Sequence, residues 1–354
     1  MNVLSKFTSL SRRQILFPLA ILLSTLVTNG IILALCSYNP WEALWVAIVG
    51  AFGNGQRIAE TLIKGVPFLL TGLAVAFSFR CGIWNIGAEG QFLVGAIAST
   101  WCGMQIAPHL PAVLAIPLTL LVGAAAGGFW ALIAALLKVY RGVQEVISTI
   151  MLNYVAIHLL SYMVDGGPLQ EAAKRGPQSD MIAAASYLPR LIPHTRFHLG
   201  LPLAIALAII LSIVLFRTVL GYQIRAVGAN PKAAQAAGIS ISKNVILALF
   251  ISGALAGLGG AIELTALTRR LFLNFSPGYG YTAIAVALLA KLHPLWVILS
   301  SLLFGALKTG SDAMQQMAGI SAKMTFVIQA TIIFFVLIYG VSSFREQRRK
   351  LNVG

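Results

Sequence analysis

The sequence predicts an all-α polytopic membrane protein with about ten transmembrane or partial helices, for three reasons. Hydrophobic residues make up 58% of the 354 residues and charged residues only 10%, whereas soluble domains carry about 25% charged side chains. Apolar runs such as 198–216 and 324–344 have the roughly 20 residues that a helix needs to cross the hydrocarbon layer. A helix also satisfies its backbone polar groups internally, as a segment surrounded by lipid must.

Ten apolar segments are the expected helices. The first follows Lys6, Arg12 and Arg13 and is longer than the apolar part of a signal peptide, so we expect it to be retained. Two segments are weak, because Gly and polar residues interrupt one of them and the other is too short to span alone. In order, the segments are 14–36, 59–80, the interrupted 89–107, 111–137, 144–164, 198–216, 244–267, the short 278–291, 294–311 and 323–344.

The basic residues predict an orientation. Lys and Arg collect in the cytoplasmic loops of membrane proteins, and ten spans place most of the 25 Lys and Arg residues on the side of both termini. We therefore expect cytoplasmic termini, a cytoplasmic loop at 221–243 and an exterior loop at 165–197, with Arg269 and Arg270 as local exceptions. The net charge of +15 then reflects the orientation of the chain in the membrane. It does not indicate nucleic acid, because the basic residues form no continuous basic face.

A faint internal symmetry relates residues 59–164 to residues 244–344. Each half has a Gly-rich span, a short segment with polar residues at its start, and two further spans. Five spans separate the halves, and an odd offset gives inverted repeats, which many transporters use to build a central site. We expect one transmembrane domain, residues 1–354, with these two repeats and a cytoplasmic loop at 221–240.

That loop contains a short predicted helix. Asn230-Pro231 favours a helix start and Gly238 a helix end, since Pro suits a first helical position and Gly a terminating one. An Ala-rich helix with little charge is suited to dock into a groove of a partner. The alternative is an ordinary helix that lies on the membrane surface.

No catalytic or metal site is expected. The chain has no GxxxxGK[ST], HExxH or GxSxG motif, and Cys36, Cys81 and Cys102 lack metal-site spacing. A membrane-embedded enzyme would need a catalytic constellation that is not recognisable here. We expect no cofactor in this chain, and any ATP that powers transport must be hydrolysed by another chain.

Polar side chains inside apolar segments are costly in a membrane and therefore mark candidate sites. Glu145, Thr149 and Asn153 recur every four residues, which places them on one helix face. Glu89 and Glu145 also fit a structural role, because the helix dipole favours an acid at an N-terminus. Aromatic residues could stack on a solute or serve as anchors. The candidate pathway residues are Asn85, Glu89, Gln91, Thr149, Asn153, Tyr154, Tyr279 and Tyr281.

Five motifs give a specific resemblance. They are "FRCGIWNIGAEGQ" (79–91), "STIMLNY" (148–154), "RAVGANPKAAQAAGI" (225–239), "SGALAGLGGAIE" (252–263) and "SPGYGYTAIAVALLAKLHP" (276–294). In this order they resemble the permeases of ATP-binding-cassette importers in the branched-chain amino acid, ribose and nucleoside superfamily. The pattern is closest to the nucleoside and simple-sugar branch, and the likeness runs from about residue 60 to residue 340.

The resemblance implies a permease subunit that translocates a nucleoside or simple sugar across the bacterial inner membrane and has no ATPase site of its own. The implied partners are a cytosolic ATPase that binds ATP and Mg, a second permease that is a homologue, an extracytoplasmic solute-binding protein and membrane lipid. The loop 221–240 is similar to the coupling helix that touches the ATPase. Its implied coupling residues are Arg225, Gly228, Asn230, Pro231 and Gly238.

An ion-coupled secondary transporter of a small polar solute is the alternative. Both kinds of transporter predict inverted repeats. Ion-coupled carriers usually hold acidic groups deep in the membrane, whereas the acids here cluster near the predicted ends of spans. This difference favours the importer permease.

Overall fold

The computed structural model describes residues 12–321 and, beyond them, residues 324, 326–328, 330, 331, 334, 335 and 338, with side chains described from Leu23 on. These residues form helices and no named β-strand, so the predicted all-α class is confirmed. Among them, six helices are long and apolar enough to cross a membrane, and a bent helix pair provides up to one more span. The chain is a multi-pass membrane protein.

The chain divides into two compact units, Met1–Arg57 with Leu307–Gly354, and Ile58–Ala306. In the described part of the first unit, α1 (Arg12–Leu35) is followed by α2 (Pro40–Phe52), and the chain bends by 120° between them. α2 is absent from the predicted spans. Most of the predicted last span, 323–344, lies outside the described residues, so the inverted repeats within one domain stay a prediction.

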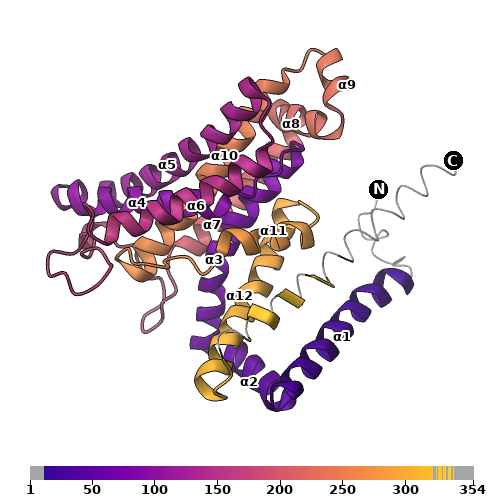
Figure 1. Cartoon of the computed structure of the whole chain (residues 1–354), viewed down its shortest axis with the longest axis vertical. Helices are drawn as coiled ribbons and strands as arrows, with labels where there is room; N and C mark the ends of the chain where they lie inside the picture. Colours follow the sequence, from indigo (N-terminus) through magenta and orange to yellow (C-terminus); the bar gives the residue numbers. More distant parts are fainter. Residues whose placement is uncertain are drawn as a thin grey trace. The chain divides into compact units, whose positions relative to one another are not determined.

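The second unit is a bundle of helices (Figure 1). Two 3₁₀ turns, η2 and η3, lie in its connections, and a π-helical turn, η4, continues α10. The elements are α3 (Gly55–Arg80), α4 (Ala88–Gln105), η2 (Ala107–His109), α5 (Ala112–Arg141), α6 (Glu145–Val164), η3 (Ala184–Ser186), α7 (Gly200–Arg217), α8 (Val219–Ala229), α9 (Pro231–Ala236), α10 (Ile241–Glu263), η4 (Leu264–Thr268), α11 (Tyr279–Leu289) and α12 (Pro294–Met317).

The predicted spans from 59–80 to 294–311 coincide with helices of this unit to within a few residues, except at the end of α12. α11 has 11 residues and is short, as predicted. α4 is one continuous helix of 18 residues, although Gly and polar residues were expected to interrupt it. It stays helical because its polar residues are buried and bonded near its start and its glycines lie against other helices.

Small residues bring α4, α5 and α10 together, and the three helices run side by side in Figure 1. A Cβ atom at Gly95 of α4 would collide with the backbone of Gly257 of α10. A Cβ atom at Gly127 of α5 would collide with the backbone of Gly253 and Gly257. These glycines therefore let the helix backbones make close contact, the packing role that small residues have in membranes.

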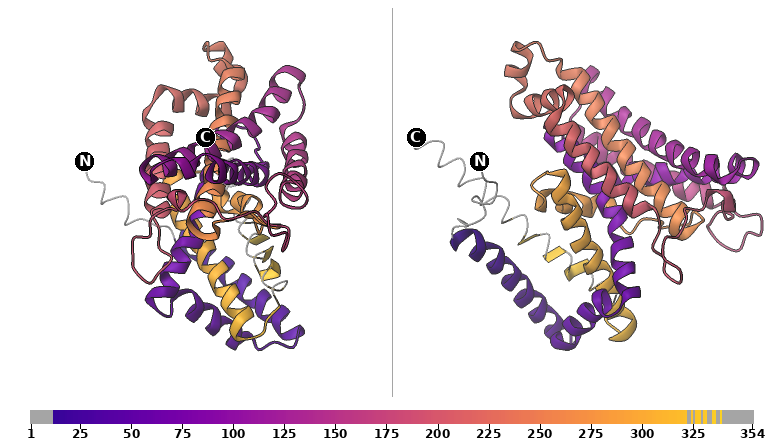
Figure 2. Two further views of the ribbon diagram at one scale, coloured as in Figure 1. Left: turned by 90° about the vertical axis from the view of Figure 1, so that its left-hand side faces the viewer. Right: turned by 180° about the vertical axis from the view of Figure 1, so that it is seen from behind.

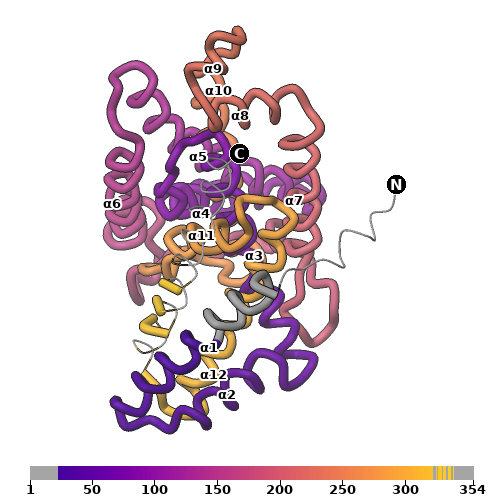
Figure 3. Tube along the Cα trace, turned by 90° about the vertical axis from the view of Figure 1, so that its right-hand side faces the viewer, coloured from indigo at the N-terminus to yellow at the C-terminus, as the bar shows by residue number. Residues whose placement is uncertain are grey.

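The bundle has two distinct ends (Figures 1, 2 and 3). α8 and α9 lie at one end, and the long connection 165–199 lies at the opposite end. The C-terminus of α3 belongs to the α8–α9 end, because Gly228 touches the backbone of Arg80 and Cys81. This arrangement separates the two loops that the charge pattern predicts to lie on opposite sides of the membrane.

Candidate functional site

The N-termini of α4 and α11 meet inside the bundle. The Gly280 backbone N–H of α11 donates a hydrogen bond of 2.7 Å to Oε2 of Glu89, which lies in the first turn of α4. Gly278, the residue before α11, provides no side-chain cap. Glu89 thus caps the N-terminus of α11 from the first turn of α4, and the dipoles of both helices favour its negative charge. Glu89 therefore has the structural role expected of an acid at a helix N-terminus.

Asn85 lies in the connection between α3 and α4 and is fully buried. Its Nδ2 donates to Oε1 of Gln91 at 2.9 Å and to Oγ of Ser252 at 2.8 Å, and Nε2 of Gln91 donates back to Oδ1 of Asn85 at 3.0 Å. Ser252 in turn donates to the carbonyl oxygen of Ala74 at 2.6 Å. This network connects α3, α4 and α10. Ser252 is not among the predicted site residues, although its place in an apolar helix was a signal.

Asn153 connects α6 to the start of α4. Its Nδ2 donates to the carbonyl oxygen of Ile86 at 2.9 Å, and its Oδ1 accepts from the Gly90 N–H at 2.8 Å. The predicted polar face of this helix is confirmed, since Glu145, Thr149 and Asn153 are all buried on it.

The first two residues of that face have local bonds. The Thr149 hydroxyl donates to the carbonyl oxygen of Glu145 at 2.7 Å, and the Glu145 carboxylate pairs with Lys138 across the turn between α5 and α6. Glu145 therefore stabilises the turn.

Burial divides the eight predicted pathway residues into two groups. Two tyrosines are exposed, Tyr154 by 54% and Tyr281 by 42%, and they lie close enough to interact electrostatically. Tyr279 is buried, with its ring centroid 5.0 Å from that of Phe68. The buried group is Asn85, Glu89, Gln91, Thr149, Asn153 and Tyr279, each at most 6% exposed. In the isolated chain, the two exposed tyrosines are therefore the predicted pathway residues whose side chains a solute could contact.

The α9 segment has the predicted boundaries. Oδ1 of Asn230 accepts from the Ala233 N–H at 3.1 Å, and Pro231 is the first helical residue. Gly238 follows the helix with a φ of +78°. The Gly238 N–H bonds to the carbonyl of Gln235 and the Ile239 N–H to that of Ala234, both at 3.0 Å, which is a Schellman end. Apart from Ala234, all residues of α9 are exposed.

The base of this segment is α8, a helix that the sequence did not predict. A Cβ atom at Gly228 would collide with the Arg80 carbonyl, so α8 can lie this close to the end of α3 only with Gly at that position. Nε of Arg225 donates to the carbonyl oxygen of Gly221 at 3.3 Å. This bond lies within α8, between residues four positions apart.

Comparison with known proteins identifies the family. Residues 57–337 match the family described as branched-chain amino acid transport system / permease component. The chain belongs to this permease family. No solved structure matches it.

Three similar relatives cover nearly the full length of the permease. It is 37% identical to the guanosine ABC transporter permease protein NupP of Bacillus subtilis, with 91% of this chain and 93% of the relative aligned. It is 36% identical to the glucose ABC transporter permease protein TsgB13 of Haloferax volcanii, over 90% of this chain and 86% of the relative. It is 33% identical to the nucleoside ABC transporter permease protein NupB of Lactococcus lactis, over 92% of this chain and 91% of the relative.

Proposed function

We propose that the permease is the membrane subunit of an ATP-binding-cassette importer that translocates a nucleoside or simple sugar across a bacterial inner membrane. The observation that carries the proposal is similarity over about nine tenths of the chain to permeases named for guanosine, glucose and nucleosides. An extracytoplasmic binding protein delivers the solute, and a separate ATPase subunit binds ATP and Mg. A second, homologous permease completes the membrane core.

The charge at the two ends of the bundle supports a cytosolic α8–α9 end and cytoplasmic termini. Near this end lie eight basic residues, and the excess of Lys and Arg is the cytoplasmic signature. The opposite end holds six basic residues, Lys174, Arg175, Arg190, Arg196, Arg269 and Arg270, against the acids Asp165, Glu171 and Asp180, so its positive excess is smaller. The eight basic residues are Arg80, Lys138, Arg141, Arg217, Arg225, Lys232, Lys243 and Lys291.

α9 is the proposed contact with the ATPase. Its exposed residues carry one charge, that of Lys232, and the rest are Pro, Ala and Gln. A nearly uncharged helix surface at the end of the bundle is suited to the groove of another protein. Arg225 and Gly228 hold the base of the segment, while Asn230, Pro231 and Gly238 set its ends.

Tyr154 and Tyr281 are the proposed contacts with the solute. Aromatic faces stack on the bases of nucleosides and on the apolar faces of sugars. The buried residues Asn85, Glu89, Gln91, Thr149, Asn153 and Tyr279 hold the helices that carry these rings. Asn153 bonds to Ile86 and Gly90, so it holds α6, the helix that carries Tyr154, against the start of α4.

The energy source and the solute are tested together by uptake of labelled guanosine and labelled glucose. Cells that contain the permease, its ATPase and its binding protein should take up one class of solute, and loss of either partner should abolish uptake. Uptake that continues without the ATPase but stops when proton and sodium gradients are dissipated would identify an ion-coupled carrier instead.

A further inference from the structure

Two arginines and a histidine gather on the ring of Phe216, near the ends of α3, α7 and α11. The guanidinium carbons of Arg80 and Arg225 lie 5.5 and 5.4 Å from the ring centroid of Phe216. The His293 ring stacks on the same ring at 4.9 Å. Burial and the nearby Arg80 charge lower the pKa of His293, so this imidazole is neutral at pH 7 and the arginines carry the charge.

Arg80 also bonds to the backbone of the turn that carries a further cation, Lys291. Its Nε donates to the Leu292 carbonyl oxygen at 2.9 Å and its Nη2 to the Lys291 carbonyl oxygen at 3.2 Å. Lys291 and Leu292 have left-handed backbones, with φ of 50° and 57°, a conformation that non-glycine residues rarely adopt without support. The two hydrogen bonds hold this turn in place. We call Arg80, Arg225 and Lys291 the cationic cluster.

Within the described residues, no ion pair neutralises the cationic cluster. In the part of the chain that the structure describes, ion pairs join Lys138 to Glu145, Arg196 to Glu60, and Lys308 to Asp312, and none includes a member of the cluster. Like charges held together repel, and an anion bound between them relieves the repulsion. The cluster therefore favours an anionic ligand.

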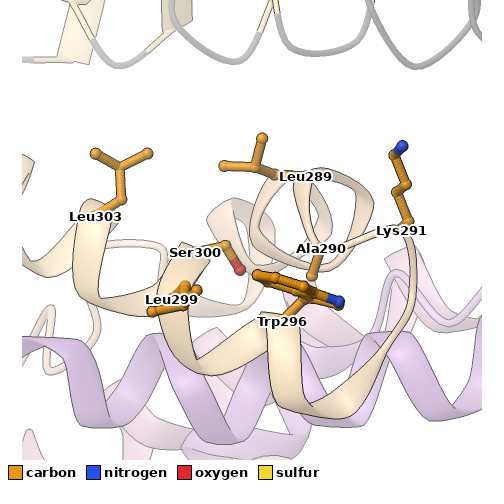
Figure 4. Close-up of a pocket in the computed structure, with 7 residues that line it drawn as sticks. All are labelled: Leu289, Ala290, Lys291, Trp296, Leu299, Ser300 and Leu303. Carbon is orange, nitrogen blue, oxygen red and sulfur yellow. The ribbon is translucent and has the colours of Figure 1, made fainter. Parts of the chain in front are cut away.

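An apolar groove of about 480 Å³ begins at Lys291 (Figure 4). In the close-up, Lys291 stands at one end and Leu303 at the other, with Trp296 and Leu299 between them. Trp296, Leu299 and Leu303 follow one face of α12 and are 58%, 57% and 47% exposed. The groove is lined by Leu289, Ala290, Lys291, Trp296, Leu299, Ser300 and Leu303.

We propose that the cationic cluster and this groove bind one anionic phospholipid, with its phosphate at Lys291 and the arginines and an acyl chain along α12. The spanning helices α3 and α7 end at Arg80 and Arg217, which places the cluster at the level of the lipid headgroups. Basic pockets between transmembrane helices on the cytoplasmic side are suited to anionic headgroups. Tryptophan is enriched at this depth of a membrane. The proposal does not depend on which solute the permease transports.

Quenching of Trp296 fluorescence tests the site. The full-length permease, purified and delipidated in detergent, is titrated with phosphatidylglycerol or phosphatidylcholine that carries brominated acyl chains. Comparison with a Trp296→Phe variant isolates the signal of this residue. We expect Trp296 to be quenched by both lipids, with at least fivefold higher affinity for phosphatidylglycerol.

Lys291→Gln tests the charge. Since one basic residue near a membrane surface contributes about 1 kcal/mol to binding anionic lipid, this variant should weaken phosphatidylglycerol binding about fivefold and leave phosphatidylcholine binding unchanged. Lys243→Gln is the matched control, because Lys243 is an exposed lysine that does not line the groove. It should bind both lipids like the native chain.

Two results would overturn the proposal. One is equal affinity for the two lipids, or a preference for phosphatidylglycerol that Lys291→Gln does not change. The other is unchanged lipid binding by Lys291→Gln together with weaker association of the ATPase, which would make the cationic cluster a protein docking surface. Neither result depends on solute uptake, so the proposed transport function is tested separately.

Discussion

The two ends of the bundle differ in where their polar groups find partners. At one end, the connection 165–199 is bonded to the segment that follows α10. The Ser179 N–H donates to the Leu271 carbonyl at 2.7 Å, and the Ile182 N–H to the Arg269 carbonyl at 2.9 Å. The Arg269 guanidinium lies 4.3 Å from the Tyr187 ring centroid. At this end, polar groups of the connection therefore find partners within the same chain.

At the other end, α9 makes few bonds beyond its own turns. Asn230 and Gly238 close the helix on itself, and five of its six residues are exposed. The connection 165–199 has these bonds to a neighbouring segment, whereas a short exposed helix with little charge gains most from a partner. This difference is the basis of our proposal that α9 transmits the motion of the ATPase.

Gly228→Val should have the largest effect, because it separates the base of the α9 segment from the bundle. The new Cβ would collide with the carbonyl of Arg80, and overpacking of this kind costs about 1–3 kcal/mol or more. We expect a fall in thermal stability and in the yield of monodisperse protein on size exclusion. The control is Gly176→Val in the opposite loop, where a Cβ has open space. Equal stability of the two variants would contradict the close contact.

Acid should weaken the opposite end through His198. Its Nδ1 accepts from the Gly200 N–H at 3.1 Å, and burial lowers its pKa to about 4, whereas an unfolded histidine titrates near 6.5. The unfolded chain therefore binds the proton first, and stability present above pH 6.5 is lost as pH falls towards 4.

We expect the loss from His198 to reach about 3 kcal/mol. The measurement is thermal unfolding from pH 7.5 to 4.5 for the native chain and for His198→Asn, which can still accept the bond but does not titrate. The variant should lose less stability over this interval. Parallel curves would assign the acid sensitivity to other groups.

Between the two ends, Asn153 and Tyr154 should respond differently to replacement by Ala. Asn153→Ala leaves the Gly90 N–H and the Ile86 carbonyl without their side-chain partner, so it should cost about 2 kcal/mol of stability. Tyr154 is 54% exposed, so Tyr154→Ala should lower solute uptake and leave the melting temperature unchanged. Full uptake by Tyr154→Ala would remove this ring from the pathway.

Asn230→Ala should have the smallest effect. It removes the cap of α9, and such a loss costs about 1 kcal/mol. We expect uptake to fall by less than half in whole cells while the melting temperature of the complex changes little. Asn230→Asp keeps the accepting oxygen and should restore uptake. An equal loss of uptake in both variants would show that the loss does not come from removal of the cap.

The sequence predicts a short helix correctly where a capping residue at its start and a glycine at its end occur together. Asn230-Pro231 and Gly238 predicted α9, and the structure has both bonds. The same Asn-Pro signal starts α2, where Oδ1 of Asn39 accepts from the Trp41 N–H at 3.0 Å. α2 has 13 residues, fewer than a membrane span needs, so its apolar length does not predict it as a span.

The polar site was predictable as a list of residues but not as a set of contacts. Asn85, Gln91 and Asn153 were visible as polar groups in apolar segments. Their partners were not, because the Asn85 bond to Ser252 joins residues 167 positions apart. The cap that Glu89 provides for α11 likewise joins residues 191 positions apart. Such pairings depend on helix packing, which periodicity within one helix does not specify.

The central claim, that α9 transmits ATPase motion, is tested most directly by Gly238→Arg in the purified complex. Gly238 has open space around its Cβ position, so the arginine has room, but it must adopt a φ of +78° and it adds a charge to the proposed docking surface. The matched variants are Gly238→Asn, since Asn tolerates this backbone, and Gly176→Arg at the opposite end.

The readouts are co-purification of the ATPase and solute-stimulated ATP hydrolysis. We predict that Gly238→Arg lowers stimulation at least tenfold, while Gly238→Asn and Gly176→Arg stay near the native level. Unchanged assembly and unchanged stimulation in Gly238→Arg would contradict the account and place the contact elsewhere.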